Sequence, residues 1–203
     1  MGFTAAFYDA VLWRGERRGM RARRASLLGA AHGRVLEIGA GTGLNLAHYP
    51  DAVDEIVLTE PVEAMSVRLK RRAAELGDRA HVVTTPAENL PFADDSFDTA
   101  VSTLVLCTVE YPERALAEIN RVLKPGGQLL FIEHVRSDSP RLARWQDRLH
   151  KPWFAVGDGC NCNRPVLDLL RGAVPLERVE RATWRGMPQI VHPLVYGKAV
   201  TRA

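Results

Sequence analysis

The stretch VLEIGAGTGLNL (residues 35–46) is the most informative part of the sequence for the fold, because it joins an apolar strand to a glycine-rich turn. Glycines at positions 39, 41 and 43 allow a tight turn and let a ligand lie directly against the backbone. The G-x-G-x-G spacing is one residue shorter than the G-x-G-x-x-G dinucleotide fingerprint, and no Gly-Lys-Ser/Thr follows. The turn therefore argues against both a dinucleotide motif and a P-loop.

Short apolar runs alternate with helical patterns beyond this turn. Apolar residues recur at helical spacing over 62–76 and 112–123, and KPGG (124–127) is expected to end the second helix. The apolar runs are near-continuous, which is typical of strands covered on both faces, and occupy residues 34–40, 54–60, 80–86, 97–106 and 127–135. Strands and helices in alternation need crossover connections, so an α/β fold with a parallel sheet is predicted.

The last third of the chain has a different pattern. Residues 140–175 look helical and irregular, whereas 176–184 and 192–201 look like two terminal strands. The 203 residues suit one domain, and no linker divides them. We divide this single domain into an N-terminal helical lid or basic segment, a ligand-binding core, and an insert with terminal strands, at residues 1–33, 34–135 and 136–203.

Composition and charge exclude several classes of protein. A hydrophobic content of 46% with 25% charged residues is ordinary for a folded domain with a core. No apolar run approaches the roughly 18 residues that a membrane-spanning helix needs. The first residues place an apolar stretch before a basic run, which reverses the order of a secretory signal. Three cysteines cannot all pair with one another, so a reducing, cytoplasmic compartment is expected.

Positive charge is concentrated near the N-terminus, although the formal net charge is only +3. Six arginines fall between Arg14 and Arg24, and only Glu16 relieves them. The segment is interpreted as a solvated helix face, with peripheral contact to an anionic membrane as one alternative and nucleic acid as another. No aromatic residue is interleaved after Trp13, which argues against base stacking and a nucleic-acid partner.

Two carboxylates near the glycine turn indicate the kind of ligand. Glu60 ends the second predicted strand, where a carboxylate can accept hydrogen bonds from both hydroxyls of a ribose. Glu37 precedes the turn and could meet the ammonium of an amino acid. An adenosyl ligand with an amino-acid tail fits both charges, so S-adenosylmethionine is the predicted cofactor.

The stretch VLEIGAGTGLNL (35–46), which contains the glycine turn, resembles motif I of the class I S-adenosylmethionine-dependent methyltransferases. LTEP, TPAENLPFADDSFDTAVS and EINRVLKPGGQLLFIEHV resemble the following motifs of that superfamily, in the same order. The resemblance implies a Rossmann-like, doubly wound, mostly parallel seven-stranded sheet with an antiparallel terminal strand. It also implies cofactor-binding roles for Glu37, Gly39, Ala40, Gly41, Gly43, Asn45, Glu60, Pro61, Met65, Ala87, Glu88, Ser102, Thr103 and Leu104.

A narrower resemblance concerns the methyl acceptor. STLVLCTVEYP (102–112), RWQDRLHKPWF (144–154) and GDGCNCNR (157–164) are similar to the thiol S-methyltransferases of animal endoplasmic reticulum and lipid droplets, the methyltransferase-like 7 group. Those proteins carry a hydrophobic N-terminal anchor where this chain has its basic segment. They usually have Leu-Thr where this chain has Cys162 and Asn163.

Candidate acceptor-side residues follow from this resemblance and from residue chemistry. His134 ends the fifth predicted strand and could act as a base or orienter, and Asp158 could act beside it. Arg164 could neutralise an acidic acceptor or pair with Asp158. The other residues predicted to bind an acceptor are Tyr8, Trp145, Trp153, Cys160, Asn161 and His192. A pocket walled by Trp145 and Trp153 would favour small apolar acceptors.

The stretch AVGDGCNCNRPV (155–166) holds two of the three cysteines, Cys160 and Cys162. A C-x-C pair offers too few ligands for zinc, and no histidine stands at a recognisable spacing, so no metal is predicted. A disulfide between them would be strained. The stretch is interpreted as a loop and helix entry, with Asn161 or Asn163 capping a helix that begins at Pro165.

Together these features predict a methyltransferase that passes a methyl group by in-line displacement to a small apolar acceptor. A thiol is the leading acceptor. A lipid amine or a quinone at a membrane surface is the alternative, and an RNA-binding methyltransferase is a more remote one.

Overall fold

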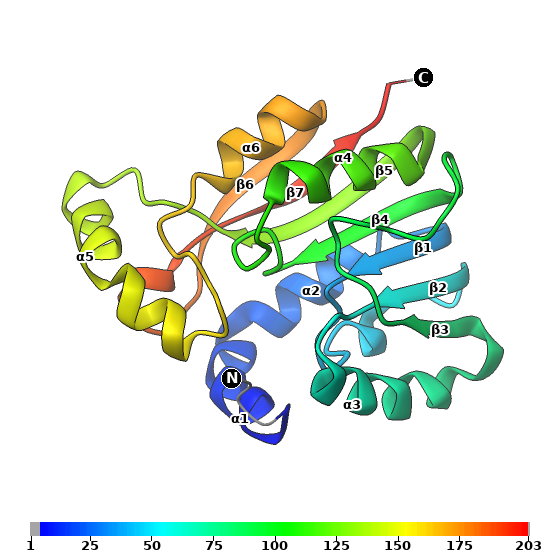
Figure 1. The fold of residues 1–203 in the computed structure, drawn as a ribbon, viewed down its shortest axis with the longest axis horizontal. Coiled ribbons are helices and arrows are strands. Elements are labelled where there is room, and N and C mark those ends of the chain that lie inside the picture. Colours follow the sequence, from blue (N-terminus) through cyan, green and yellow to red (C-terminus); the bar gives the residue numbers. More distant parts are fainter. Residues whose placement is uncertain (1–4, 203) are drawn as a thin grey trace.

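The strands form one seven-stranded sheet in the order β3-β2-β1-β4-β5-β7-β6 (Figure 1). The computed structural model describes residues 5–202, with side chains from residue 9 onward. The first five strands are parallel neighbours, and β7 runs antiparallel to both β5 and β6. This confirms the predicted topology. The strands are β1 (Gly33–Ile38), β2 (Val53–Thr59), β3 (Ala80–Val83), β4 (Phe97–Thr103), β5 (Leu123–His134), β6 (Leu176–Thr183) and β7 (Pro193–Val200).

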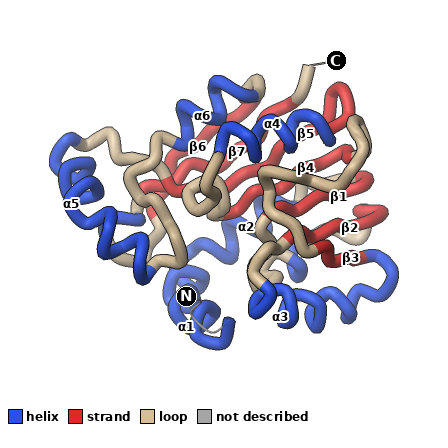
Figure 2. The backbone as a smooth tube through the Cα atoms, viewed as in Figure 1, coloured by secondary structure: helices blue, strands red, loops and turns tan. Residues whose placement is uncertain are grey.

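Helices cover the sheet and extend beyond one end of it (Figures 1 and 2). The α-helices are α1 (Ala5–Gly15), α2 (Arg21–Leu28), α3 (Glu63–Ala73), α4 (Pro112–Val122), α5 (Pro140–Val156) and α6 (Val166–Ala173). Shorter helical turns are η1 (Glu16–Met20), η2 (Leu46–His48), η3 (Ala74–Arg79) and η4 (Gln189–Val191). Among these residues, no helix combines the length and the apolar character that a membrane crossing needs.

Side-chain alternation along the strands builds a core on each face of the sheet. Leu36 and Ile38 of β1 pack in the same apolar cluster as Leu116 of α4 and Leu170 of α6. The intervening Val35 belongs to the opposite cluster, with residues of α2 and α3. Because neighbouring side chains on a strand point to opposite faces, a continuous apolar run is what two covered faces require.

The strand order places the ligand crevice. β1 pairs with β2 on one side and with β4 on the other, so the chain changes direction across the sheet at β1 and β4. In open α/β sheets, ligands bind outside the carboxyl ends of the strands at such a switch point. The glycine turn follows β1 at this point, and Thr103 ends β4 beside it.

Several boundaries differ from the sequence-based expectation. β3 ends at Val83 and β4 at Thr103, both three residues before the predicted ends of their strands, whereas α4 does end just before KPGG. KPGG itself lies within β5, whose pairing with β4 shifts register between Phe97 and Thr99. The register shift accommodates the extra residues, because an irregular pair can take up additional chain without breaking the strand.

The arginine-rich segment is only partly a solvated face. Arg14, Arg17, Arg18 and Arg21 are exposed, but Arg24 is buried. Its guanidinium donates to Asn45 Oδ1 at 2.8 Å and pairs with Glu16 at 3.1 Å. One arginine of the group therefore fixes the segment to the turn that follows β1.

Candidate functional site

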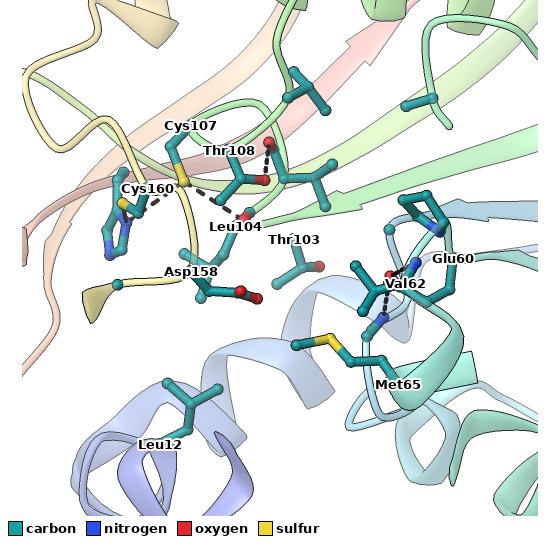
Figure 3. A pocket seen from close by; sticks show the side chains of 18 of the residues that line it. Leu12, Glu60, Val62, Met65, Thr103, Leu104, Cys107, Thr108, Asp158 and Cys160 are labelled. Atoms are coloured by element: carbon teal, nitrogen blue, oxygen red, sulfur yellow. Dashed lines mark hydrogen bonds between the residues drawn. The ribbon is translucent and has the colours of Figure 1, made fainter. Parts of the chain in front are cut away.

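A cavity of about 410 Å³ lies at the carboxyl ends of the parallel strands. Its walls come from the glycine turn, the ends of β2 and β4, the loop after α5, and Leu12 of α1 (Figure 3). In Figure 3, Glu60 and Met65 stand at one end, Cys107 and Cys160 at the other, and Thr103 and Asp158 between them. A volume of this size accommodates a small-molecule ligand.

The glycine turn leaves backbone open to the cavity. Gly39 and Gly41 line it and have φ angles of +53° and +58°, a region that side chains other than glycine rarely adopt. A Cβ on Gly41 would meet nothing within 4 Å, so this position opens to the ligand space. A Cβ on Gly39 would lie 2.8 Å from Val105 Cγ2. The turn thus forms a shallow cradle that a side chain would fill or distort.

Glu60 is oriented by the backbone before any ligand arrives. Its Oε2 accepts the Gly41 N–H and its Oε1 accepts the Val62 N–H, each at 2.8 Å (Figure 3). Each carboxylate oxygen has a second lone pair, so two positions remain for hydroxyl donors. Burial raises the pKa of Glu60, while the two backbone N–H groups lower it. Pro61 and Met65 line the cavity beside it.

Glu37 does not line the cavity and lies in a buried polar cluster behind the turn. Its carboxylate accepts Tyr49 Oη at 2.6 Å and Asn45 Nδ2 at 3.0 Å. Burial raises its pKa to about 7. This placement does not support the predicted contact of Glu37 with a ligand ammonium, and Asn45 also lies behind the turn rather than in the cavity lining.

Of the other residues predicted to bind the cofactor, some line the cavity and others do not. Ala87, Glu88, Thr103 and Leu104 line the cavity. Glu88 Oε1 accepts the backbone N–H groups of Glu110 and Tyr111, so the side chain also fixes the loop after β4. Ala40, Gly43 and Ser102 are not part of the lining.

Glu133 is a residue that the sequence interpretation missed. It is fully buried, accepts Ser102 Oγ at 2.6 Å and the Val105 N–H at 3.1 Å, and leaves Oε2 without a hydrogen-bond partner. Burial raises its pKa to about 7. An acidic residue inside an apolar strand, just before His134, was the available signal.

The end of the cavity opposite Glu60 is built from sulfur and aromatic groups. His134 Nδ1 lies 3.7 Å from Cys107 Sγ and 3.3 Å from Cys160 Sγ, and all three residues are buried. The imidazole packs against Trp184 with ring centroids 5.1 Å apart. The sequence interpretation missed Cys107 and Trp184 as site residues, because Cys107 read as one more apolar position.

The two thiols have different acid strengths. A hydrogen bond between the two thiols raises the pKa of Cys107 well above its usual range and lowers that of Cys160 well below it. Burial raises both, and the neighbouring His134 lowers that of Cys160. Cys160 is therefore the thiol of this pair that ionises first.

Asp158 stands between the two ends of the cavity (Figure 3). It has a φ of +53°, and Gly159 beside it has a φ of +79°. Positive φ at an Asp-Gly pair is typical of a tight turn, and here the turn aims the carboxylate at the ligand space. Burial raises the pKa of Asp158.

Arg164 and the residues around it correct the predicted acceptor set. Arg164 does not pair with Asp158, and its Nη1 donates instead to the backbone carbonyls of Leu106 and Val109, at 2.7 Å each. Asn161 donates to the Cys107 carbonyl at 3.1 Å and contacts His150. These contacts join the loop after α5 to the loop after β4, two tan segments that approach one another in Figure 2.

Three more predictions are corrected by position. Trp145 is 49% exposed and does not wall the cavity, although Trp153 does. His192 Nε2 contacts the Met187 carbonyl at 2.7 Å outside the lining. Pro165 stands at the cap of α6 without a side-chain cap, so neither Asn161 nor Asn163 has the predicted capping role.

The N-terminal helix α1 contributes apolar side chains to the cavity wall and a carboxylate that anchors the helix. Val11 and Leu12 line the cavity, and Asp9 accepts Thr42 Oγ1 at 2.5 Å and Arg72 Nη2 at 2.8 Å. These bonds fix α1 to the glycine turn and to α3. The predicted contact of Tyr8 lies outside the residues whose side chains are described.

Comparison with known proteins agrees with this geometry. The family model described as a methyltransferase domain matches residues 36–131. The thiol S-methyltransferase TMT1B of Rattus norvegicus is 38% identical over 174 residues, covering 82% of this chain and 70% of that protein. A phosphatidylethanolamine N-methyltransferase of Cereibacter sphaeroides is 34% identical over 125 residues, covering 61% of each.

A solved structure shows the same fold. The structure of a geranyl diphosphate methyltransferase in complex with S-adenosylmethionine superposes with a TM-score of 0.70 at 16% identity, covering 91% of this chain and 86% of that one. Similarity at this level of identity concerns the arrangement of the sheet and helices.

Proposed function

This chain belongs to the S-adenosylmethionine-dependent methyltransferases, in the family that includes the thiol S-methyltransferase TMT1B, and on that premise we propose that its acceptor is a small apolar thiol. The observation that carries the proposal is the end of the cavity beyond Thr103. Cys107, His134, Cys160 and Trp153 make that end sulfur-rich and aromatic.

The cofactor half of the cavity suits the adenosyl ligand. Bound S-adenosylmethionine supplies a methyl group on a sulfonium, which is already electrophilic. Glu60 offers two free acceptor positions to ribose hydroxyls, and Gly41 leaves its side of the turn open. The ends of β1, β2 and β4 hold these groups fixed, so they do not have to reorganise on binding.

The acceptor half aligns a nucleophile and keeps water away. A free thiol has a pKa of about 8.5, so part of it is ionised at neutral pH and a strong base is not required. Asp158 projects between the two halves and is positioned to take the proton that the thiol loses. Trp153 and Leu12 give apolar walls, which favour an apolar acceptor and exclude water from the in-line approach.

Acceptor class can be tested with matched substrates. Purified protein and S-adenosylmethionine would be incubated with alkanethiols, and with alkanols and alkylamines of the same chain lengths, while S-adenosylhomocysteine is measured. We expect turnover with the thiols, and at least tenfold less with the matched alcohols. No transfer to any thiol, with rapid transfer to an amine or a quinone, would refute the thiol proposal.

A lipid amine or a quinone at a membrane surface is the second candidate. Exposed Trp13 lies in the same segment as the exposed Arg14, Arg17 and Arg18, a combination that favours an anionic membrane surface. The similarity to a phosphatidylethanolamine N-methyltransferase supports the same candidate.

Membrane contact is best tested by charge substitution, because deleting the segment would also remove the buried contacts of Arg24. The triple variant Arg14→Gln, Arg17→Gln, Arg18→Gln should bind vesicles containing phosphatidylserine more weakly than the wild-type protein. Equal sedimentation of both proteins with these vesicles would remove the support for this candidate. Activity on a free thiol should stay the same in the variant.

A further inference from the structure

Three potential metal ligands converge at the end of the cavity opposite Glu60, although their spacing along the chain matches no metal-binding pattern. Cys107 follows β4, His134 ends β5, and Cys160 lies in the loop after α5. One ligand atom from each residue lies within 4.8 Å of the other two. We propose that Cys107, His134 and Cys160 bind a thiophilic divalent cation such as Zn²⁺, with one coordination position open to the cavity.

The distances fit the proposed ion. Zinc bonds of about 2.3 Å to sulfur and 2.0–2.1 Å to nitrogen place neighbouring sulfur and nitrogen ligands of a tetrahedron about 3.6 Å apart. The two separations observed here are 3.7 Å and 3.3 Å. A cation could therefore enter with small side-chain adjustments and without movement of the strands.

The orientation of the imidazole also favours an ion. His134 Nδ1 is the ring atom that faces both sulfurs, and the Cys107 thiol also contacts the Leu104 carbonyl at 3.5 Å. A shared cation would engage the nitrogen and both thiolates together. Two thiolates and one imidazole carry two negative charges, so a divalent cation makes a neutral group, which lowers the cost of burial.

The three ligands predict both the type of ion and an open fourth coordination position. Thiolate and imidazole favour zinc over the calcium and magnesium that prefer oxygen. Three protein ligands are typical of zinc sites that keep a fourth position for water or substrate. All three residues line the cavity, so the fourth position faces the space where the acceptor is proposed to bind.

The zinc site itself is independent of the proposed function, but the role of its open position in methyl transfer rests on that function. An acceptor thiol that takes the fourth position would release its S–H proton to solvent or to Asp158 and bind as a thiolate. The sulfur lone pair would then form the new S–CH₃ bond, while the methyl–sulfonium bond breaks and leaves S-adenosylhomocysteine. Neither oxidation nor reduction occurs.

Cys162 supplies a matched control within the same cluster. It is a buried cysteine packed beside Cys107 and Cys160, but its Sγ contacts the Gln146 carbonyl at 3.8 Å and it does not line the cavity. Wild-type protein stripped by a chelator should bind one equivalent of Zn²⁺, with a Kd between about 1 nM and 1 µM. Cys162→Ser should behave like the wild type, whereas Cys107→Ser, Cys160→Ser and His134→Gln should each weaken binding at least about 100-fold.

The measurements are zinc content by mass spectrometry and competition with a chromophoric chelator, both without cofactor or acceptor, so they do not depend on activity. Unfolding in urea shows whether each variant still folds, and added Zn²⁺ should raise the unfolding midpoint of the wild-type protein. Failure of wild-type protein to bind one equivalent would overturn the metal site. An equal loss of binding in Cys162→Ser would overturn the assignment of ligands.

Cobalt reports on the open position. Co²⁺ bound to the protein should give thiolate-to-metal charge-transfer absorption, and an alkanethiol should increase it while the matched alkanol should not. No response to the thiol would overturn the claim that the open position faces the acceptor space. A positive zinc result together with an absence of thiol methylation would separate this site from the proposed function.

Discussion

Replacing Glu37 with glutamine should remove a specific pH dependence from the stability of the fold. Glu37 is buried, and burial raises its pKa from 4.5 to about 7. Between these two values the folded chain holds a proton that the unfolded chain releases. The stabilisation is therefore complete below about pH 4.5 and is lost as the pH rises through about 7.

The size of the effect follows from this difference in pKa. Each pKa unit corresponds to about 1.4 kcal/mol, and integrating the two titrations from about pH 5 to about pH 8 gives a loss of about 2.5 kcal/mol from the wild-type protein. Glu37→Gln does not titrate. The variant should therefore gain about 2.5 kcal/mol relative to wild type over the same range, whatever its stability at about pH 5.

Urea unfolding followed by circular dichroism measures this difference, since groups that titrate in both proteins cancel. Tyr49→Phe provides a second arm. The Tyr49 hydroxyl donates to Glu37 and lowers its pKa, so the pH-dependent loss in Tyr49→Phe should be centred at a higher pH. A stability difference between Glu37→Gln and wild type that stays constant with pH would refute the reasoning.

Three further substitutions test the cavity itself. Glu60→Ala should weaken S-adenosylmethionine binding about 100-fold in calorimetry, because it removes both hydroxyl acceptors at once; an unchanged Kd would exclude Glu60 from the ribose site. Arg164→Met should lower the free energy of unfolding by about 3 kcal/mol, because it removes two charge-assisted bonds to backbone carbonyls; a loss of acceptor affinity at full stability would instead support the acceptor role predicted from the sequence. Trp153→Ala should raise the KM for an alkanethiol at least about tenfold, because Trp153 lines the cavity. Trp145 is half-exposed, so Trp145→Ala should change this KM less than about twofold. Equal effects of the two substitutions would contradict this assignment of the cavity wall.

Most residues predicted to bind the cofactor lie together for reasons that act locally along the chain. The glycines of the turn, Glu60 and the end of β4 each follow a parallel strand, and the carboxyl ends of parallel strands meet at one edge of the sheet. Glu37 and Asn45, which were also predicted to bind the cofactor, lie outside the cavity lining. Sequence position put them beside the turn, but side-chain direction decides whether a residue faces the ligand space or the core behind it.

The residues predicted to bind an acceptor lie further apart in the structure, because several come from loops whose packing is not encoded locally. Arg164 and Asn161 were expected to bind a ligand, but they connect two loops through backbone carbonyls. Trp145 and Trp153 belong to the same helix, and only the way α5 sits on the rest of the fold exposes one and turns the other to the cavity.

The fold class, the glycine turn and the cofactor can be predicted from the amino-acid sequence, because strand alternation, turn glycines and strand-end carboxylates all act within a few residues of the chain. Only the tertiary structure brought Cys107, His134 and Cys160 together, from the ends of two parallel strands and from a distant loop. Their spacing along the chain has no fixed period. The strand register, the burial of β5 and the loop contacts set their separations, so three residues that look unrelated in the sequence form a compact cluster.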